Sequence, residues 1–366
     1  MNQLKNIKDW GLTITNSDPF LIAGPCSAET KEQVLMSCQG AKMAGASILR
    51  AGVWKPRTRP HAFEGVGEAA LEWLKEAKEI YDLPVMIEVA NARHIELAMN
   101  NGIDMFWIGA RTTVNPFSVQ EIADSLSGTD VPVFVKNPVN PDLELWIGAF
   151  ERLNKAGISK LAGIFRGFSV SKSAPYRNMP LWDYPIELKR RIPNIEILCD
   201  PSHICGNRNM LLSVAQNAMD LLFDGLMIET HNNPSQAWSD ANQQINGEEL
   251  KQLMNDLVIR NEYTHDPEIM ANISALRYDI DNLDAEILEL MAKRMEVSRE
   301  IAQYKRQANM SVFQFNRWLE LFEKRMELSS EFGLSADFAS ELIRTIHNES
   351  IKQQSNIIND HLLGKS

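Results

Sequence analysis

Four residues with metal-binding side chains follow apolar segments that lie far apart in this chain. They are Cys26, His203, Glu229 and Asp240. A thiolate, an imidazole and two carboxylates combine soft and hard donors, a set that suits Mn²⁺, Fe²⁺, Co²⁺ or Zn²⁺ and is a poor cage for Mg²⁺ or Ca²⁺. Each residue alone is more often structural, but the four together predict one divalent metal site. Such a metal polarises an aldehyde or activates water.

A second group of chemically competent residues is basic. Its members are Arg50, Lys55, Arg57, Arg111, Lys136 and Arg166, each at or soon after the end of an apolar run. Arginine offers a planar bidentate fork to phosphate or carboxylate, and lysine offers a point charge. A single residue of this kind usually forms a salt bridge, but six exceed what Glu88 and Asp200 could neutralise. The group predicts two separate anionic groups or one doubly phosphorylated substrate.

Eight short apolar runs in the first two thirds of the chain must position these residues. The runs span 21–23, 47–49, 84–87, 105–108, 131–135, 161–165, 195–198 and 226–228. Amphipathic helical stretches separate them, which predicts an α/β fold, a (β/α)8 TIM barrel with its active site at the carboxyl ends of the strands. A closed barrel places the eighth strand beside the first. The four candidate metal ligands should therefore share one arc of the rim.

Length and composition limit the class of protein. The chain has 366 residues and 44% hydrophobic content, enough for a barrel of about 250 residues and a smaller domain. A net charge of −11 disfavours a nucleic-acid partner. We expect no signal peptide and no membrane span, because the chain has neither a basic segment followed by an apolar stretch nor about 18 consecutive apolar residues. The four cysteines match no zinc ribbon, so we expect a reducing cytoplasm and structural roles for Cys38, Cys199 and Cys205.

The final third of the chain has helical periodicity. We predict a barrel domain over 1–258, a polar linker over 259–270 and an all-α domain of three helices over 271–366. Apolar residues form a heptad seam, namely Leu276, Ile280, Leu283, Ile287, Leu290, Val297, Ile301 and Tyr304. With no Gly or Pro over 271–306, one helix of about 36 residues, roughly 54 Å long, is expected there. A helix that long outruns a small domain, which predicts a homodimer or higher homo-oligomer built through it.

Several polar residues of this helical region could bind an anion. Arg294 interrupts the apolar seam, where a guanidinium needs a negative partner. Lys305 lies eleven residues further, on the same helix face, and Arg277 lies near the start of the helix. The second helix, expected over 313–332, opens with Arg317. Ser350 and Gln354 align at i and i+4 on the third, expected from Ser335 as N-cap to about Gln354. Most charged side chains on long helices are solvated. Of the residues named here, Arg294 is the least consistent with a solvated position.

The barrel motifs resemble those of type Iβ 3-deoxy-D-arabino-heptulosonate 7-phosphate (DAHP) synthase. The motifs are Gly-Pro-Cys-Ser at 24–27, Lys-Pro-Arg-Thr at 55–58, Gly-Ala-Arg at 109–111, Asp-Pro-Ser-His at 200–203 and Ser-Asp at 239–240. The resemblance implies that Cys26, His203, Glu229 and Asp240 hold the metal. It implies that phosphoenolpyruvate and erythrose 4-phosphate are bound by Arg50, Lys55, Pro56, Arg57, Thr58, Ala110, Arg111, Lys136 and Arg166. Among these, the four residues of the Lys55–Thr58 loop would take the erythrose 4-phosphate.

The implied reaction is attack of the phosphoenolpyruvate methylene on a metal-polarised aldehyde, followed by water addition and loss of phosphate. Lys136, Lys55, Cys26 and His203 would be catalytic. The alternative is the sister family, 3-deoxy-octulosonate 8-phosphate synthase, which takes arabinose 5-phosphate. Its loop reads Lys-Ala-Asn-Arg-Ser, unlike the loop at 55–58 here. Type Iβ members often carry an amino-terminal regulatory domain, but only about 18 residues precede the first strand here, so regulation is expected from elsewhere or is absent.

Residues 271–356 resemble the all-helical chorismate mutase, beginning with the pattern of Leu276, Arg277, Ile280, Leu283 and Asp284. The resemblance implies that chorismate is held by Arg277 of the partner subunit and by Arg294, Lys305, Arg317, Ser350 and Gln354. It implies a cofactor-free rearrangement to prephenate, with Lys305 and Arg294 catalytic and Lys305 stabilising charge on the ether oxygen. Two departures stand out. Trp318 replaces a usual Glu and alters the hydroxyl pocket, and Gln314 replaces a common acid.

These interpretations predict a bifunctional enzyme of the shikimate pathway and aromatic amino-acid biosynthesis. One alternative makes the helical domain only a regulatory sensor for chorismate or prephenate. We expect both roles to coexist, with prephenate or chorismate inhibiting the synthase through a rearrangement about the linker. A measurement of mutase turnover would distinguish a catalytic helical domain from one that only senses its ligand.

Overall fold

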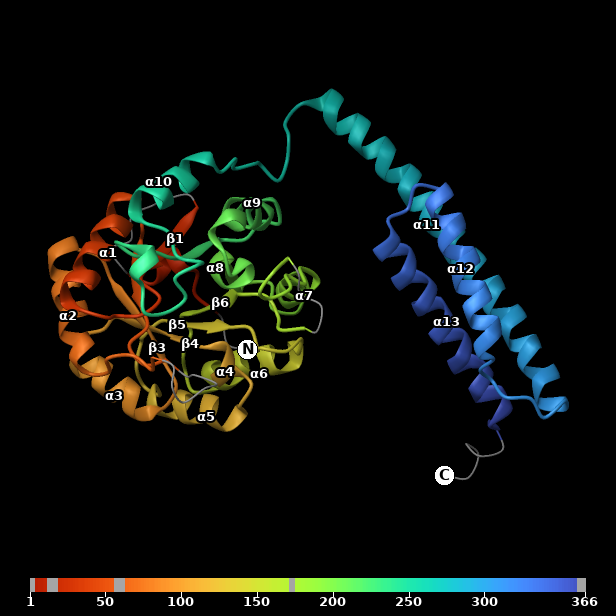
Figure 1. Ribbon diagram of the computed structural model, residues 1–366, viewed down its shortest axis with the longest axis horizontal. Coiled ribbons are helices and arrows are strands. Elements are labelled where there is room, and N and C mark those ends of the chain that lie inside the picture. Colours follow the sequence, from red (N-terminus) through yellow and green to blue (C-terminus); the bar gives the residue numbers. More distant parts are fainter. Residues whose placement is uncertain (1–3, 12–18, 56–62, 171–174, 361–366) are drawn as a thin grey trace. The chain divides into compact units, whose positions relative to one another are not determined.

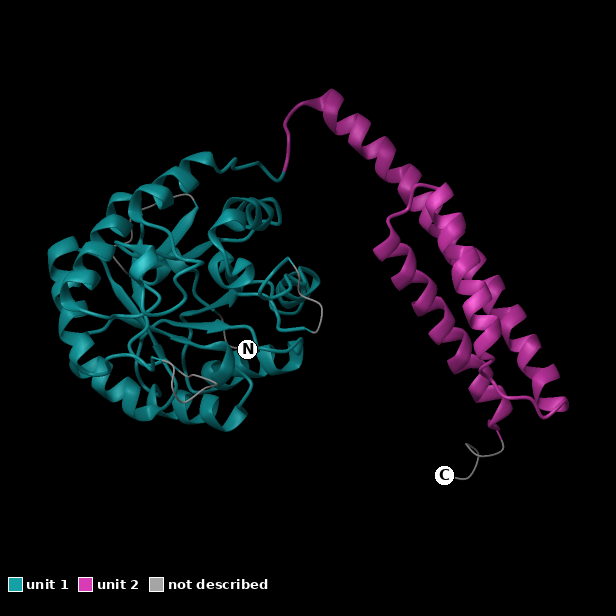
Figure 2. Ribbon diagram, in the orientation of Figure 1, with its two compact units in different colours: residues 1–262 teal, residues 263–366 magenta. Residues whose placement is uncertain are grey.

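The computed structural model describes residues 4–11, 19–55, 63–170 and 175–360. The chain divides into two compact units, Met1–Glu262 and Tyr263–Ser366 (Figure 2). Each is described by itself below. Among the described residues, no helix has the length and apolar character that crossing a bilayer requires.

The first unit is a closed barrel of eight parallel strands, as predicted (Figure 1). The strands are β1 (Phe20–Gly24), β2 (Ile48–Ala51), β3 (Val85–Val89), β4 (Met105–Ile108), β5 (Val133–Lys136), β6 (Leu161–Phe165), β7 (Glu196–Cys199) and β8 (Gly225–Glu229). Neighbours in sequence pair, and β8 closes the barrel on β1, with Gly24 opposite Glu229. Strands β2 and β5 extend through Arg50 and Lys136, so these basic residues lie within the strands rather than after them.

Helices surround the strands (Figure 1). They are α1 (Lys31–Met43), α2 (Ala69–Tyr81), α3 (Ala92–Asn100), α4 (Ala110–Thr113), α5 (Pro116–Ser125), α6 (Leu143–Lys155), α7 (Asp183–Arg191), α8 (Pro201–Cys205), α9 (Leu211–Asp220) and α10 (Gly247–Asp256), with short 3-10 turns η1 (Ile7–Asp9), η2 (Arg208–Met210) and η3 (Pro234–Gln236). Side chains of Thr30, Asn91 and Asp142 accept backbone N–H groups at the starts of α1, α3 and α6. These caps satisfy donors that a helix leaves unpaired and so fix where each helix begins.

The barrel interior is filled by side chains. Its buried cluster includes Ile22, Ile48, Met86, Met105, Trp107, Phe134, Ala162, Ile164, Leu198 and Met227. The segment around η1 adds Ile7 and Trp10, and the Trp10 ring meets Phe134 edge-on at 5.3 Å. A barrel with a packed interior leaves ligands only its rim.

The second unit consists of three helices, α11 (Pro267–Gln307), α12 (Phe315–Glu331) and α13 (Ala336–Ile358). The long helix α11 has 41 residues and begins four residues before the predicted start at 271. The Asp266-Pro267 pair, which lies in the segment predicted as a linker, starts the helix: Asp266 accepts the N–H groups of Glu268 and Ile269, and Pro267 occupies the first turn. Helix α13 runs four residues past its predicted end at Gln354.

The apolar seam of α11 is exposed within one chain. Leu276, Ile280, Leu283, Ile287 and Leu290 are each more than half exposed, between 54% and 63%. Further along the helix, Ser298 and Ala302 are buried. An apolar face of this extent is typical of a helix that packs on another chain.

Candidate active sites

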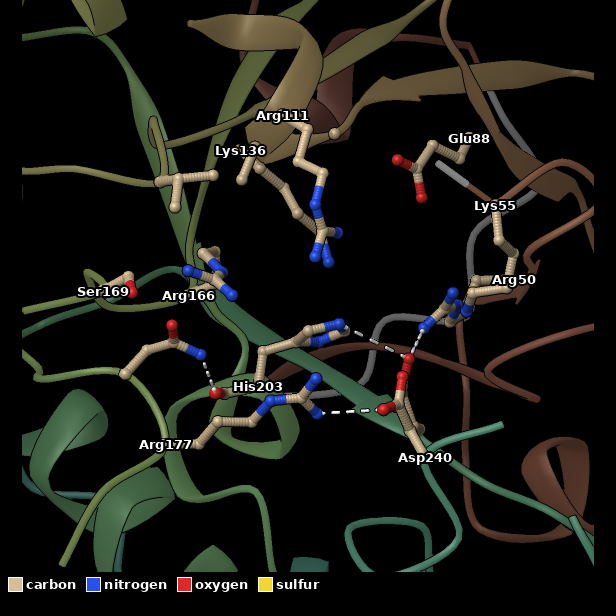
Figure 3. A pocket seen from close by; sticks show the side chains of 15 residues that line it. Arg50, Lys55, Glu88, Arg111, Lys136, Arg166, Ser169, Arg177, His203 and Asp240 are labelled. Atoms are coloured by element: carbon tan, nitrogen blue, oxygen red, sulfur yellow. Dashed lines mark hydrogen bonds and ion pairs between the residues drawn. The ribbon is translucent and has the colours of Figure 1, made fainter. Parts of the chain in front are cut away.

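A cavity of about 260 Å³ lies at the carboxyl ends of the barrel strands (Figure 3). The sequence-predicted residues that line it are Arg50, Lys55, Ala110, Arg111, Lys136, Arg166, His203, Glu229 and Asp240. Pro56, Arg57 and Thr58 lie outside the described residues. The structure adds Glu88, Arg177 and Asn178 to the lining.

Strand alternation directs these side chains toward the barrel mouth. Successive side chains on a strand face opposite sides, so a residue two positions beyond an interior residue faces the interior as well. The pairs are Ile48 and Arg50, Met86 and Glu88, Phe134 and Lys136, Ile164 and Arg166, Leu198 and Asp200, and Met227 and Glu229. The same periodicity that fills the core therefore brings charged residues together at its upper end.

Three of the four predicted metal ligands form a tight cluster. Ligand atoms of Cys26, Glu229 and Asp240 all lie within 4.8 Å of one another. The Cys26 sulfur is 3.2 Å from Asp240 Oδ2. His203 lies beside this cluster, with Nε2 3.8 Å from Glu229 Oε1. The donor set of one thiol, one imidazole and two carboxylates fits a transition metal such as Mn²⁺, Fe²⁺, Co²⁺ or Zn²⁺.

The loops after β1 and β8 are held together around this cluster. The Cys26 N–H donates to Gln244 Oε1 at 3.0 Å, and Ser27 and Ser239 share a hydroxyl hydrogen bond of 2.6 Å. Buried Glu29 accepts the Trp238 N–H at 2.8 Å. These contacts hold the segment that leads to Asp240, whose φ of 49° lies in the left-handed region. Contacts of this kind orient metal ligands before a metal binds.

Burial and nearby charges shift the pKa of the Cys26 thiol upward and the pKa values of the Glu229 and Asp240 carboxylates downward. Burial, reinforced by Glu229, raises the pKa of the Cys26 thiol to about 12. Burial also acts to raise the pKa of Glu229, but His203, Arg50 and Lys55 outweigh it and lower that pKa to about 2. Asp240 is likewise held below its usual pKa, because Arg177 and His203 outweigh the effect of burial. The two carboxylates are therefore ionised at neutral pH.

Two buried cations lie against one aromatic ring. Arg50 Nη1 is 2.8 Å from Glu229 Oε1, and Lys136 Nζ is 2.7 Å from Asp200 Oδ2. The Arg50 guanidinium lies 4.6 Å from the centre of the Trp107 ring, and the Lys136 ammonium lies 5.8 Å from it. Cation–π contact and ion pairing together make these charges tolerable in a buried position.

Positive charge exceeds negative charge in the cavity wall. Arg166 is the clearest case: burial, with Arg177 and Arg111 nearby, lowers the pKa of its guanidinium to about 10 in spite of Asp200. The guanidinium groups of Arg111 and Arg166 point toward the same central space (Figure 3). Like charges placed this close favour an anionic ligand between them.

Arg177 is a site residue that the sequence reasoning missed. Its Nη1 atom lies 3.0 Å from Asp240 Oδ1 and 2.6 Å from Gln243 Oε1. Arg177 follows β6 by more than ten residues, so the rule that looks at strand ends does not reach it. Gln243 was missed for the same reason, although its Nε2 donates to Glu229 Oε2 at 2.6 Å.

The helical unit contains a second cavity, of about 450 Å³. Arg294, Lys305, Arg317, Ser350 and Gln354 line it, so the structure brings together five of the six residues predicted for this region. Arg294 Nη1 donates to Ser350 Oγ at 2.5 Å, and Lys305 Nζ donates to Gln354 Oε1 at 3.1 Å. The sixth residue, Arg277, is exposed on α11 and does not line the cavity of its own chain.

The two residues that depart from the chorismate mutase pattern also line this cavity. Gln314 and Trp318 do so, together with Arg325 and His347, which the sequence reasoning missed. Burial, with Arg325 nearby, lowers the pKa of Arg294, and burial lowers the pKa of Lys305. No Asp or Glu is among the described residues that line the cavity. A wall of cations without a carboxylate suits a ligand with several negative charges.

Comparisons with known proteins match each of the two units to a family. The model of the DAHP synthetase I family matches residues 6–266, and the model of chorismate mutase type II matches residues 276–355. The chain therefore belongs to the DAHP synthetase I family. It carries a chorismate mutase type II domain on its carboxyl side, and the two families support both enzymatic activities.

Individual relatives each match only part of this chain. Phospho-2-dehydro-3-deoxyheptonate aldolase of Thermotoga maritima is 30% identical over 237 residues, which cover 65% of this chain and 68% of the relative. The crystal structure of DAHP synthase from Thermotoga maritima matches with a TM-score of 0.58 and 29% identity, over 65% of this chain and 67% of that chain. The T-protein of Haemophilus influenzae is 28% identical over 86 residues, 24% of this chain and 23% of the T-protein. The chain thus spans about a quarter of the T-protein.

Proposed function

We propose that this chain is a metal-dependent, feedback-regulated bifunctional enzyme. Its barrel condenses phosphoenolpyruvate with erythrose 4-phosphate to DAHP and phosphate, and its helical unit rearranges chorismate to prephenate. The observation that carries the first activity is the cation-rich cavity beside Cys26, Glu229 and Asp240. The second rests on the cavity lined by Arg294, Lys305 and Arg317.

In the barrel, the chain's own residues bind and orient two anionic substrates. Phosphoenolpyruvate is held by Arg50, Lys55, Ala110, Arg111, Lys136 and Arg166, and erythrose 4-phosphate by the loop 55–58. Lys136 and Arg166 neutralise charge as the phosphate leaves, since Lys136 is a buried cation and Arg166 a partly buried one at the cavity wall. Lys55 lies between the two substrates, beside Cys26.

Cys26, His203, Glu229 and Asp240 would hold one divalent metal. When bound, this ion supplies Lewis acidity toward the aldehyde oxygen. The protein contributes the geometry. Asp200 Oδ1 accepts the backbone N–H of His203 at 3.0 Å, and Asp200 Oδ2 lies 2.8 Å from Nδ1 of the His203 ring. That arrangement directs Nε2 of His203 toward Glu229.

In the helical unit, the cavity selects a reactive conformer of chorismate without a cofactor. Arg294 and Arg317 bind carboxylates, and Lys305 stabilises negative charge on the ether oxygen. Ser350 and Gln354 hold Arg294 and Lys305 in place through the hydrogen bonds described above. Arg277 of the partner subunit completes the site in a homodimer built on the exposed seam of α11.

Regulation follows from the fusion of the two domains. We propose that segment 259–270 links a synthase domain over 1–258 to a mutase domain over 271–366, and that prephenate or chorismate bound in the helical unit inhibits the barrel. A helical unit that only senses the ligand is the alternative. A cytoplasmic location is proposed because the four cysteines are free and the Cys26 thiol must stay reduced.

Two assays on the full chain test this function. Chorismate should be consumed by the purified protein, and DAHP formation should fall when prephenate is added. Equal synthase rates with and without prephenate would remove the feedback proposal. Inhibition without mutase turnover would favour the sensor.

A further inference from the structure

One imidazole in the helical cavity has no role in the function proposed above. His347, on α13, lines the cavity with Arg294 and Lys305. Its Nε2 atom is buried and has no hydrogen-bond partner within the described part of the chain. Leaving a buried polar atom unpaired is unfavourable, so unpaired atoms in a cavity wall point to a ligand group or water.

Aromatic packing fixes the orientation of this imidazole. The ring stacks on Trp318, with centroids 4.0 Å apart and planes 21° from parallel. Phe313 contacts it edge-on, with centroids 6.0 Å apart. Trp318 in turn packs against Phe322. A ring held between two aromatic side chains is oriented before a ligand enters.

The surroundings keep the ring uncharged. Burial, followed by Arg294, Arg325 and Lys305, lowers the pKa of His347. These cations face the ring from α11 and α12, and the described residues of the cavity wall include no carboxylate to oppose them. A neutral imidazole can donate or accept a hydrogen bond, whereas the guanidinium and ammonium groups only donate.

Two other neutral polar side chains of α13 in the cavity wall, Ser350 and Gln354, are already engaged. Ser350 Oγ accepts from Arg294 and donates to the Ile346 carbonyl at 2.9 Å. Gln354 accepts from Lys305, and its Nε2 donates to Ser298 Oγ at 3.0 Å. His347 therefore supplies a neutral polar atom without a partner of its own.

We propose that Nε2 of His347 forms a hydrogen bond with the hydroxyl group of the bound substrate and selects for ligands that carry it. The inference rests on the proposed mutase function. Chorismate has two carboxylates, an ether oxygen and one hydroxyl. The cations match the first three groups, and the hydroxyl is the uncharged group that needs a neutral partner. With Trp318 in place of an acid, that partner comes from the neighbouring helix.

The test compares chorismate with the analogue that lacks the ring hydroxyl, as substrates of the full chain. Wild-type protein should prefer chorismate in kcat/KM by about tenfold or more, the effect of one buried hydrogen bond. His347→Phe keeps the aromatic stack and removes the nitrogens, so its preference should fall to near one, mainly through loss of chorismate turnover. His347→Gln keeps a donor and an acceptor and should retain part of the preference.

Controls separate this inference from the function on which it rests. His265→Phe changes a histidine outside the cavity and should keep the wild-type preference. If His347→Phe does not fold, His347→Leu makes the same comparison. A wild-type preference in the folded apolar variant would overturn this inference alone. Absence of chorismate turnover in wild-type protein would overturn the mutase function, and this inference with it.

Discussion

The ammonium group of Lys55 lies 2.7 Å from the thiol sulfur of Cys26 and 2.7 Å from the carbonyl oxygen of the same residue. Lys55 opens the loop that carries the Lys-Pro-Arg-Thr motif, and Cys26 belongs to the cluster of candidate metal ligands. This contact joins the proposed aldehyde-binding loop to the proposed metal site. A substrate held by that loop would therefore approach the metal ligands directly.

Replacing Cys26 should abolish the synthase activity of the barrel and leave the mutase activity of the helical unit unchanged. In Cys26→Ala the soft donor is lost, and we expect metal-dependent phosphate release to fall below detection while chorismate turnover stays near wild type. The matched control is Cys38→Ala, which removes another buried thiol, on α1. Full synthase activity in Cys26→Ala with bound Mn²⁺ would contradict the assigned ligand set.

The buried ion pair between Arg50 and Glu229 makes a prediction about stability. Both side chains are at most 2% exposed, so Arg50→Met leaves Glu229 buried without its guanidinium partner. We expect a loss of about 3–5 kcal/mol in the free energy of unfolding, measured by denaturant titration. Arg190→Met, which breaks an exposed pair with Glu187, should leave the transition unchanged. Equal effects of the two variants would refute the argument.

Lys305 should matter for turnover and little for folding. It is partly exposed and faces the helical cavity, so Lys305→Ala creates no core void. We expect chorismate turnover to fall by about 10²-fold or more, because a donor to developing charge is lost, with the melting temperature nearly unchanged. Lys293→Ala, an exposed lysine of the same helix paired with Glu289, is the control. Near-normal turnover in Lys305→Ala would show that the site is wrongly assigned.

Glu196, at the start of β7, predicts a pH dependence. Burial raises its pKa, even though its carboxylate accepts the Ile7 N–H. Because the folded state disfavours the charged form, stability is highest below the ordinary glutamate pKa of about 4.3 and falls as pH rises through the higher folded value. Glu196→Gln lacks this loss, so its melting temperature relative to wild type should increase between pH 4.5 and pH 7.5. A constant difference would contradict the prediction.

The barrel could be predicted from sequence because one periodicity encodes both its core and its rim. Ile48 and Arg50, or Phe134 and Lys136, are two positions apart on one strand, so an apolar run that ends in a charge marks a strand and its active end. The start of α11 was mispredicted because an Asp-Pro pair can either end a segment or begin a helix. Only the capping contacts of Asp266 decide between these outcomes.

The missed residues depend on contacts between distant segments. Arg177 reaches Asp240 across 63 positions, and Gln244 reaches Cys26 across 218. Neither follows from a local pattern. His347 lies on a helix where an aromatic residue at that spacing reads as ordinary packing. Its meaning depends on Trp318 of another helix and on the cations around both rings.

Phosphate release from phosphoenolpyruvate by the purified full chain tests the central claim most directly. The assay is run with erythrose 4-phosphate or arabinose 5-phosphate, before chelation, after chelation and after Mn²⁺ is restored. The account predicts release with erythrose 4-phosphate alone, lost on chelation and regained with Mn²⁺. Release with arabinose 5-phosphate alone would place the barrel in the sister family and contradict the account.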